Sequence, residues 1–279
     1  MAKKSVKHDP ADGLIVGEVG RWAAEKHERL RKYIDAAGKA RAKYVPPKGW
    51  ATASYIELYS GAGRSLIEGT DRVIDGSALV AYKAAQSSAM PFTDLHLSDL
   101  EKVNSDAVAQ RIKAFGGIAH SYCGPADRIV DSVLRALNPH GLHLAFLDPF
   151  SLGQLPFSII EKMLKLRRMD MIVHVSLLDL QRNLDDYSSI GDPTLDNFAP
   201  GWRDAISVRQ ANAPLRAALI EYWLGLIRSL GSKPATGIPL VVGEQNQRLY
   251  WLVYLSSNPL GHKLWNSVQN LTGQRSLFG

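Results

Sequence analysis

Glycines and acids at the ends of predicted strands are the residues of this chain best suited to bind a small molecule. The stretch "YIELYSGAGRS", Tyr55 to Ser65, is an apolar run that contains Glu57 and then meets Gly61 and Gly63. Asp99 ends the next predicted strand, 22 residues after Ser77, which we expect to be the N-cap of the intervening helix. A glycine turn lets a backbone approach a nucleotide closely, and an acid after the second strand accepts hydrogen bonds from ribose hydroxyls. Together they indicate an adenosyl ligand. The alternatives are a plain tight turn for the glycines, and helix capping or a surface ion pair for the two acids.

Predicted strands and helices alternate along the chain in the order that would bring these residues to one edge of a sheet. Apolar stretches predict strands at 55–59, 95–97, 118–122, 142–148, 171–176, 238–243 and 250–257. Between them, helical patterns are predicted at 76–85, 104–115, 129–137 and 158–168. This alternation is typical of an α/β fold with a Rossmann-like, mostly parallel sheet. The last two strands, joined by the turn-like "EQNQR", predict an antiparallel edge.

The first motif does not match a dinucleotide fingerprint, and the whole pattern resembles a different family. "YIELYSGAG" resembles the cofactor loop of class I S-adenosylmethionine-dependent methyltransferases. With "LAFLDPF" and "YWLVYLSSNPLGHKLWN", the chain resembles the three-Cys-motif partner protein family of bacteria over about residues 22 to 265. That resemblance implies a methyltransferase-like fold, and a possible partner protein with a three-cysteine motif, such as a radical-SAM-like enzyme.

The resemblance assigns cofactor contacts to the strand ends. Glu57 would hold the ammonium group of S-adenosylmethionine, and the loop Ser60, Gly61 and Gly63 would meet its carboxylate. Asp99 would take the ribose and Leu100 would lie against the adenine. An acid is often found just after the third strand in related proteins, whereas this chain has Pro125 there and Asp127 two residues later.

"DPF", Asp148 to Phe150, is the candidate catalytic motif, because it ends the fourth expected strand. It resembles motifs of amino-methyltransferases, and more closely that of tRNA guanine exocyclic-amine methyltransferases. Asp148 and the Pro149 carbonyl would orient an amine, and Phe150 would stack a flat acceptor. The leading functional hypothesis is therefore methyl transfer to an amine nitrogen, preferably of a nucleic-acid base. The rival is a non-catalytic partner or scaffold, and a strand-end acid with a core Phe is the structural alternative.

A long polar stretch follows the fifth expected strand and is predicted to be a substrate insertion at 178–212. It is turn-rich, which is typical of a lid over a binding site. Gln181, Arg182 and Asn183 begin it and are the candidate substrate-binding residues. An ordinary surface excursion explains the same composition.

The excess positive charge sits at the start of the chain. Residues 1–48 contain 12 basic and 6 acidic residues, which accounts for the whole net charge of +6. Trp22, Leu30, Tyr33 and Ile34 have helical spacing there, so we expect a basic N-terminal helical segment at 1–48 and the α/β domain at 49–279. The segment is either a helix packed on the domain or a contact for nucleic acid.

Other classes of site are not expected. The single cysteine, Cys123, gives no disulfide or Cys-rich metal site. It also disfavours a cytosine-C5 mechanism, whose cysteine nucleophile would follow the fourth strand. His140 and His143 lack a third metal ligand at helical spacing. No apolar run is long enough for a membrane span, so a cytoplasmic protein is expected.

Overall fold

The structure is a computed structural model that describes residues 7–21, 23–207, 211–236, 238, 240–242 and 248–269 of the 279-residue chain. The chain forms two compact units, Met1–Phe146 and Leu147–Gly279. Strands and helices occur in both units, as the α/β prediction requires.

The first unit is built around parallel strands. β3 (Ala53–Glu57) pairs with β6 (Asp94–Asp99) on one side and with β8 (Leu142–Leu147) on the other, and β6 pairs with β7 (Ala119–Cys123). All five residues of β3 are buried, as expected for a strand covered on both faces. Because these strands are parallel, Glu57, Asp99 and Cys123 end at the same edge of the sheet.

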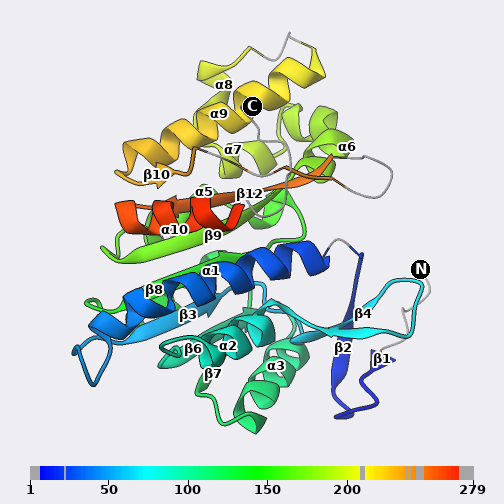
Figure 1. The fold of residues 1–279 in the computed structure, drawn as a ribbon. Coiled ribbons are helices and arrows are strands. Elements are labelled where there is room, and N and C mark those ends of the chain that lie inside the picture. The colour runs from blue at the N-terminus through cyan, green and yellow to red at the C-terminus, as the bar shows by residue number, and fades with distance from the viewer. Residues whose placement is uncertain are drawn as a thin grey trace. The chain divides into compact units, whose positions relative to one another are not determined.

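Helices connect these strands at the expected places. α2 (Ser77–Ser87), α3 (Lys102–Ala114) and α4 (Ala126–Ala136) follow β3, β6 and β7, and α3 packs on α2 and β7 (Figure 1). The expected N-cap at Ser77 was wrong. Gly76 is the N-cap, and Ser77 is the first helical residue, whose hydroxyl donates to Glu57 and accepts no capping bond from a helix N–H.

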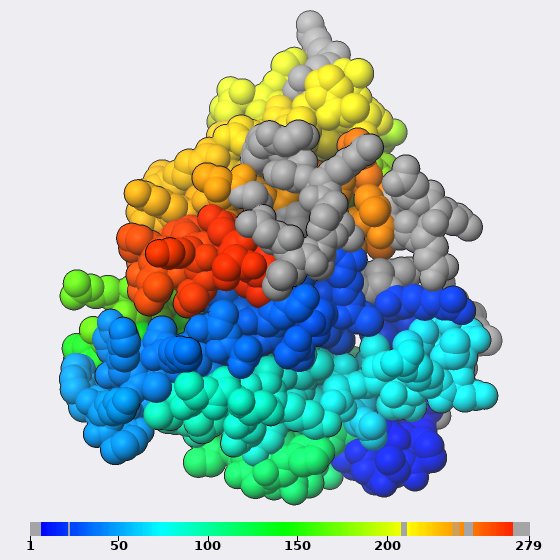
Figure 2. Space-filling model, in the orientation of Figure 1, coloured from blue at the N-terminus to red at the C-terminus, as the bar shows by residue number. Residues whose placement is uncertain are grey.

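Strands that the sequence analysis did not expect lie before and after β3. β1 (Lys7–His8), β2 (Ile15–Val19), β4 (Arg64–Ile67) and β5 (Val73–Asp75) form a separate small sheet. β2 and β4 are parallel, and Figure 2 shows the dark blue start of the chain beside the cyan β4–β5 segment on the surface of this unit. The N-terminal segment therefore begins with strands and only then becomes helical.

The expected N-terminal helix is α1 (Ala23–Tyr44), which packs on α2. Leu30, Tyr33 and Ile34 are buried, as their spacing predicts, whereas Trp22 lies outside the described residues. Several basic residues of α1 are also buried, namely Lys26, Arg29 and Arg41. The boundary at residue 48 stays a prediction.

The second unit contains an antiparallel group of strands. β12 (Arg248–Ser256) pairs antiparallel with β9 (Met169–Ser176), with β11 (Leu240–Val242) and with β10 (Lys233–Pro234). This confirms the antiparallel pairing expected for the last strands, although most of the "EQNQR" turn lies outside the described residues. Trp251, Tyr254 and Trp265 are buried, and the rings of Tyr254 and Trp265 stack with centroids 5.2 Å apart.

The rest of the second unit is helical. Its helices are η1 (Leu152–Gln154), α5 (Phe157–Met163), α6 (Leu177–Ser188), α7 (Thr194–Phe198), α8 (Trp202–Ala205), α9 (Asn212–Ser229) and α10 (Pro259–Gln269). The turn-rich description of 178–212 was wrong, because α6, α7 and α8 occupy most of its described part. None of the helices in the described ranges is long and apolar enough to cross a membrane.

Candidate functional site

The glycine loop after β3 has the backbone shape that the sequence predicted. Gly61 and Gly63 both have positive φ, 55° and 85°, which glycine adopts without strain. A Cβ on Gly63 would lie 2.7 Å from the Val108 side chain of α3, whereas a Cβ on Gly61 would meet nothing within 4 Å. Gly63 is therefore required for packing, and Gly61 borders open space where a ligand could approach the backbone.

Asp99 connects this loop to the start of α3. One carboxylate oxygen accepts a hydrogen bond of 3.0 Å from the Gly61 N–H. The other accepts bonds from the Glu101 N–H at 2.9 Å and from the Asn104 amide at 3.0 Å. The two features that the sequence analysis paired, glycine turn and acid, thus touch each other directly. Asp99 is half-buried and stands at the carboxyl end of its strand.

Glu57 is placed differently from Asp99, because it is fully buried. One of its oxygens accepts a hydrogen bond from Ser77 at the start of α2, and the other accepts one of 3.0 Å from the Tyr55 hydroxyl. Its observed contacts therefore join β3 to α2. The ammonium contact predicted for Glu57 stays a prediction.

The remaining predicted cofactor residues surround the same sheet edge. Ser60 is buried, and its N–H donates to the Ser98 carbonyl at 2.8 Å. Leu100 is 58% exposed, so its side chain is available to a ligand. Asp127 is exposed in the first turn of α4. Burial, and then the charge of Asp127, raise the pKa of Tyr59.

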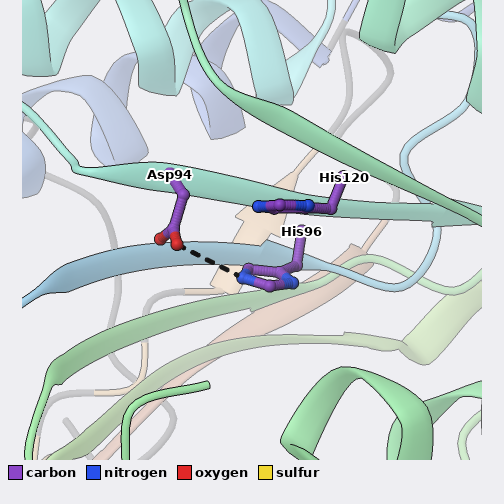
Figure 3. A group of neighbouring side chains, drawn as sticks. All are labelled: Asp94, His96 and His120. Atoms are coloured by element: carbon purple, nitrogen blue, oxygen red, sulfur yellow. Dashed lines mark ion pairs between the residues drawn. The ribbon is translucent and has the colours of Figure 1, made fainter. Parts of the chain in front are cut away.

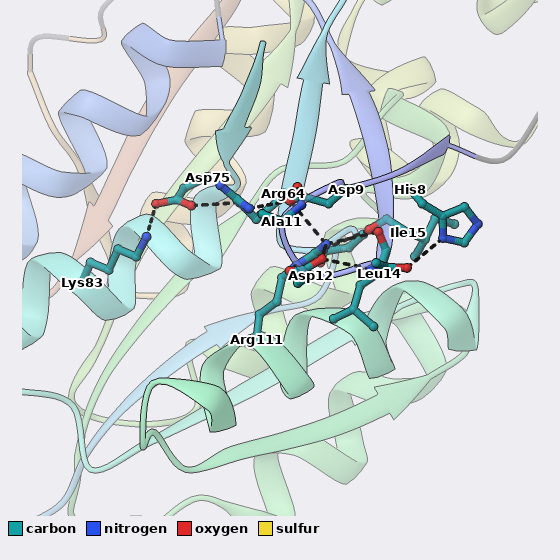
Figure 4. A network of polar contacts seen from close by, with 12 residues as sticks. His8, Asp9, Ala11, Asp12, Leu14, Ile15, Arg64, Asp75, Lys83 and Arg111 are labelled. Carbon is teal, nitrogen blue, oxygen red and sulfur yellow. Dashed lines mark hydrogen bonds and ion pairs between the residues drawn. The ribbon is translucent and has the colours of Figure 1, made fainter. Parts of the chain in front are cut away.

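A polar network that the sequence analysis missed fixes the small sheet to the glycine loop (Figure 4). The Arg111 side chain, on α3, is only 3% exposed and donates to the Asp12 carboxylate at 2.7 Å and to the Ala62 carbonyl of the loop. The hydrogen bond from Arg111 is also the main cause of a lowered pKa of Asp12. Arg64, directly after Gly63, forms an ion pair of 2.5 Å with the buried Asp9. Residues 9–12 and α3 thereby hold the loop from two sides.

The candidate catalytic motif lies in the second unit. Asp148 Oδ1 is 3.5 Å from Nδ1 of His174 on β9, and the Tyr250 ring packs on His174 with centroids 4.4 Å apart. Pro149 follows Asp148, and the Phe150 side chain is 89% exposed, with its N–H bonded to Gln154. A side chain this exposed is not part of the core, so the alternative of a core Phe is wrong.

Asp179, on α6, organises the residues next to this motif. It accepts a bond of 2.9 Å from the Leu152 N–H, one of 2.8 Å from Asn183 and one of 3.1 Å from Tyr187. Burial and the charge of Asp179 raise the pKa of Tyr187 to about 12. Asn183 is thus engaged within its helix, whereas Gln181 is half-buried and Arg182 is exposed.

Sequence signals for α6 were present but not used. Ser176 is its N-cap and accepts a bond from the Asp179 N–H, which is the first half of a capping box of the S-x-x-D kind. Leu177, Leu180 and Leu184 follow at helical spacing and are buried.

The predicted residues fall into two groups, one in each unit. The cofactor candidates, from Glu57 to Asp127, are all in the first unit, and the candidates from Asp148 to Asn183 are all in the second.

Comparison with known structures identifies the fold. A protein of Legionella pneumophila assigned to the DUF519 family superposes with a TM-score of 0.54 at 12% identity, covering 89% of this chain and 92% of the other. An O-methyltransferase from Bacillus cereus, solved in complex with SAH, gives a TM-score of 0.50 at 10% identity, covering 83% and 81%. The predicted fold class, α/β and Rossmann-like as in class I methyltransferases, is confirmed. The sequence matches no protein-family model and no curated protein, so the three-Cys-motif partner resemblance stays a prediction.

Proposed function

We propose that this protein is an S-adenosylmethionine-dependent methyltransferase that acts on an amine nitrogen, with a nucleic-acid base as the preferred acceptor. The observation that carries the proposal is the direct contact between Asp99 and the Gly61 N–H at the carboxyl edge of a parallel sheet. Ligands of open α/β sheets bind at that edge. The SAH-bound O-methyltransferase that shares the fold supports the choice of cofactor.

Asp99 and Leu100 are the proposed contacts for the nucleoside part of the cofactor. An ionised carboxylate has about four acceptor positions, and Asp99 uses three of them within the protein. One ribose hydroxyl would donate to the remaining acceptor position of Asp99, and the other would compete with the Gly61 N–H for the position that it occupies. Leu100 would cover one face of the adenine. Asp127, exposed at the start of α4, would face the far end of the base.

Asp148, Pro149 and Phe150 are the proposed acceptor residues. The exposed Phe150 ring is a surface on which a flat base can stack, and such stacking contributes about 1–3 kcal/mol per base. An oxygen of Asp148 and the Pro149 carbonyl would orient the amine lone pair. Gln181, Arg182 and Asn183 would contact the remainder of the substrate, with the exposed Arg182 suited to a phosphate.

Substitutions at the exposed Leu100 and the half-buried Asp99 test the cofactor site. Leu100→Lys should abolish calorimetric binding of S-adenosylmethionine, because a cation then occupies the adenine surface. The matched control is Ile118→Lys, since Ile118 is 60% exposed in the same unit but lies before β7, at the opposite edge of the sheet. Asp99→Asn should weaken binding by about 1.5–3 kcal/mol, the contribution of a charge-assisted hydrogen bond. Equal affinities for Leu100→Lys and Ile118→Lys would contradict the proposed site.

A non-catalytic scaffold for a three-cysteine-motif, radical-SAM-like protein is the second candidate. It is favoured by Pro125, which is the N-cap of α4 and stands where related enzymes carry an acid. The scaffold predicts cofactor binding without methyl transfer, so a transfer assay distinguishes it from the enzyme.

A further inference from the structure

Two histidines and an aspartate meet on one face of the parallel sheet, away from the residues assigned above. Asp94 begins β6, His96 lies two residues further on the same face, and His120 on β7 is paired directly with His96. One potential ligand atom from each residue lies within 4.8 Å of the others (Figure 3).

His96 contributes a buried nitrogen that has no hydrogen bond. The residue is 1% exposed, and its Nε2 has no hydrogen-bond partner among the described residues. The nearest acidic oxygen, Oδ2 of Asp94, is 3.7 Å away, which is too long for a hydrogen bond. Buried polar atoms nearly always have a partner, so this nitrogen requires an explanation.

The other ring nitrogen of His96 is held in place. Nδ1 lies 2.9 Å from the Tyr122 hydroxyl. In the tautomer that carries its proton on Nδ1, this N–H donates a hydrogen bond to the Tyr122 hydroxyl. Nε2 then has a free lone pair directed towards Asp94. An outer hydrogen bond of this kind fixes the ring and tautomer of many metal-binding histidines.

The charges of the cluster also suit a cation. The Asp94 carboxylate lies 3.7 Å from His96 Nε2, so a negatively charged group and an imidazole nitrogen border the same space. The His96 and His120 rings stack with centroids 4.7 Å apart, so both bring a ring nitrogen to the space beside Asp94. A metal ion would use both rings as neutral ligands.

We propose that Asp94, His96 and His120 form a binding site for a divalent transition metal, with Zn²⁺ the best match. Imidazole nitrogen with one carboxylate is a common ligand set for this ion, and three protein ligands leave a fourth position for water. His120 is exposed, so its ring can move and the fourth position is open to solvent. Tetrahedral bonds of about 2.0–2.2 Å place ligand atoms roughly 3.4 Å apart. Atoms that lie within 4.8 Å of one another must therefore approach by up to about 1.4 Å.

The position of the site separates it from the cofactor residues. Asp94 and Asp99 stand at opposite ends of β6, about 16 Å apart at the usual rise of a strand. A metal there would join β7 to β6 and stabilise the unit without contacting the cofactor edge. The site therefore does not depend on the proposed function.

Metal titration of the untagged, chelator-treated chain tests the proposal directly. Calorimetry with Zn²⁺ should show about one strongly bound ion per chain, and Co²⁺ should give the visible spectrum of a tetrahedral site. His120→Gln should abolish both signals, and because His120 is exposed this variant should fold normally. His96→Gln and Asp94→Asn should do the same, while Tyr122→Phe should weaken binding about 10–100-fold.

Two control variants address adventitious binding. His8→Gln removes an exposed histidine of the small sheet, and Cys123→Ser removes the exposed thiol near the end of β7. Both should bind Zn²⁺ as the wild type does. Failure of the folded wild type to bind one equivalent would overturn the proposal, as would equal binding by His120→Gln and His8→Gln.

Discussion

At the scale of single residues, accessible side chains form the proposed cofactor site, and buried polar side chains form the framework that supports it. Asp99 and Leu100 are accessible, whereas Glu57, Arg111 and His143 are buried and hydrogen-bonded. The sequence showed where acids and glycines fall relative to strands, and the contact between Gly61 and Asp99 agrees with that. It did not show that Glu57 accepts hydrogen bonds from within the protein, because its partners Ser77 and Tyr55 belong to no recognisable motif and meet it only in the folded chain.

His143 gives a prediction about pH at this scale. Burial is the main cause that lowers its pKa below the usual 6.5, and the charge of His96 lowers it further. The hydrogen bond with the Asn138 carbonyl and the charge of Asp94 act in the opposite direction. The unfolded chain therefore binds a proton more readily than the folded chain, so stability is lost as the pH falls below about 6.5 towards the folded pKa. His143→Gln should reduce the dependence of the unfolding free energy on pH in that range. Urea denaturation with a chelator at several pH values measures it, and an unchanged slope would contradict the assignment.

At the scale of elements, strands were predicted better than the helices and the small sheet. β3, β6, β7, β8, β9 and β12 coincide with predicted strands. Of these, β3, β8 and β12 are buried almost throughout and read as nearly continuous apolar runs. β1, β2, β4 and β5 are short and half-exposed, so their sequences show no clear alternation of apolar and polar residues. α9 was missed although Leu215, Leu219 and Trp223 have helical spacing and are buried.

α1 shows why a basic composition does not by itself define a binding surface. Arg41 is buried, donates to the Met90 carbonyl at 3.0 Å and to Ser88 at 2.9 Å, and lies over the Phe92 ring. Gly38 allows the close approach, since a Cβ there would lie 2.8 Å from Ser88. Arg41 is therefore part of the packing of the first unit, and its charge adds nothing to an accessible basic surface on α1.

A substitution pair within α1 tests this distinction. Arg41→Ala should lower the unfolding free energy by about 2–4 kcal/mol, because it leaves buried acceptors unpaired and removes packing. Lys43→Ala, at an exposed position two residues away, should change it by less than about 0.5 kcal/mol. Urea denaturation measures both, and similar effects for the two variants would contradict the structural role of Arg41.

At the scale of the whole molecule, the net charge of +6 favours an acidic partner. Lys39 and Lys43 are exposed on α1 and remain candidate contacts for nucleic acid. If both contact phosphates, replacing them by Ala should reduce the slope of log affinity against log salt by about 1.4–1.8. A fluorescence titration of labelled RNA measures it. Lys113→Ala with Lys165→Ala is the matched control, since both lysines are exposed, and an identical slope in the two double variants would exclude α1 as the contact.

The most direct test of the central claim is transfer of a labelled methyl group from S-adenosylmethionine to RNA, DNA and protein extracted from cells that lack the gene. Methyl transfer needs the acceptor amine to be positioned and its developing charge to be accepted, which we assign to Asp148. The wild type should label nucleic acid, and Asp148→Asn should do so roughly 10²–10⁴-fold more slowly, the usual effect of losing a positioned acid–base group. Its cofactor affinity should stay unchanged, because the proposed cofactor contacts are Asp99 and the glycine loop. Equal labelling by both proteins would contradict the role of Asp148, and cofactor binding without any labelling would contradict the enzyme and favour the scaffold.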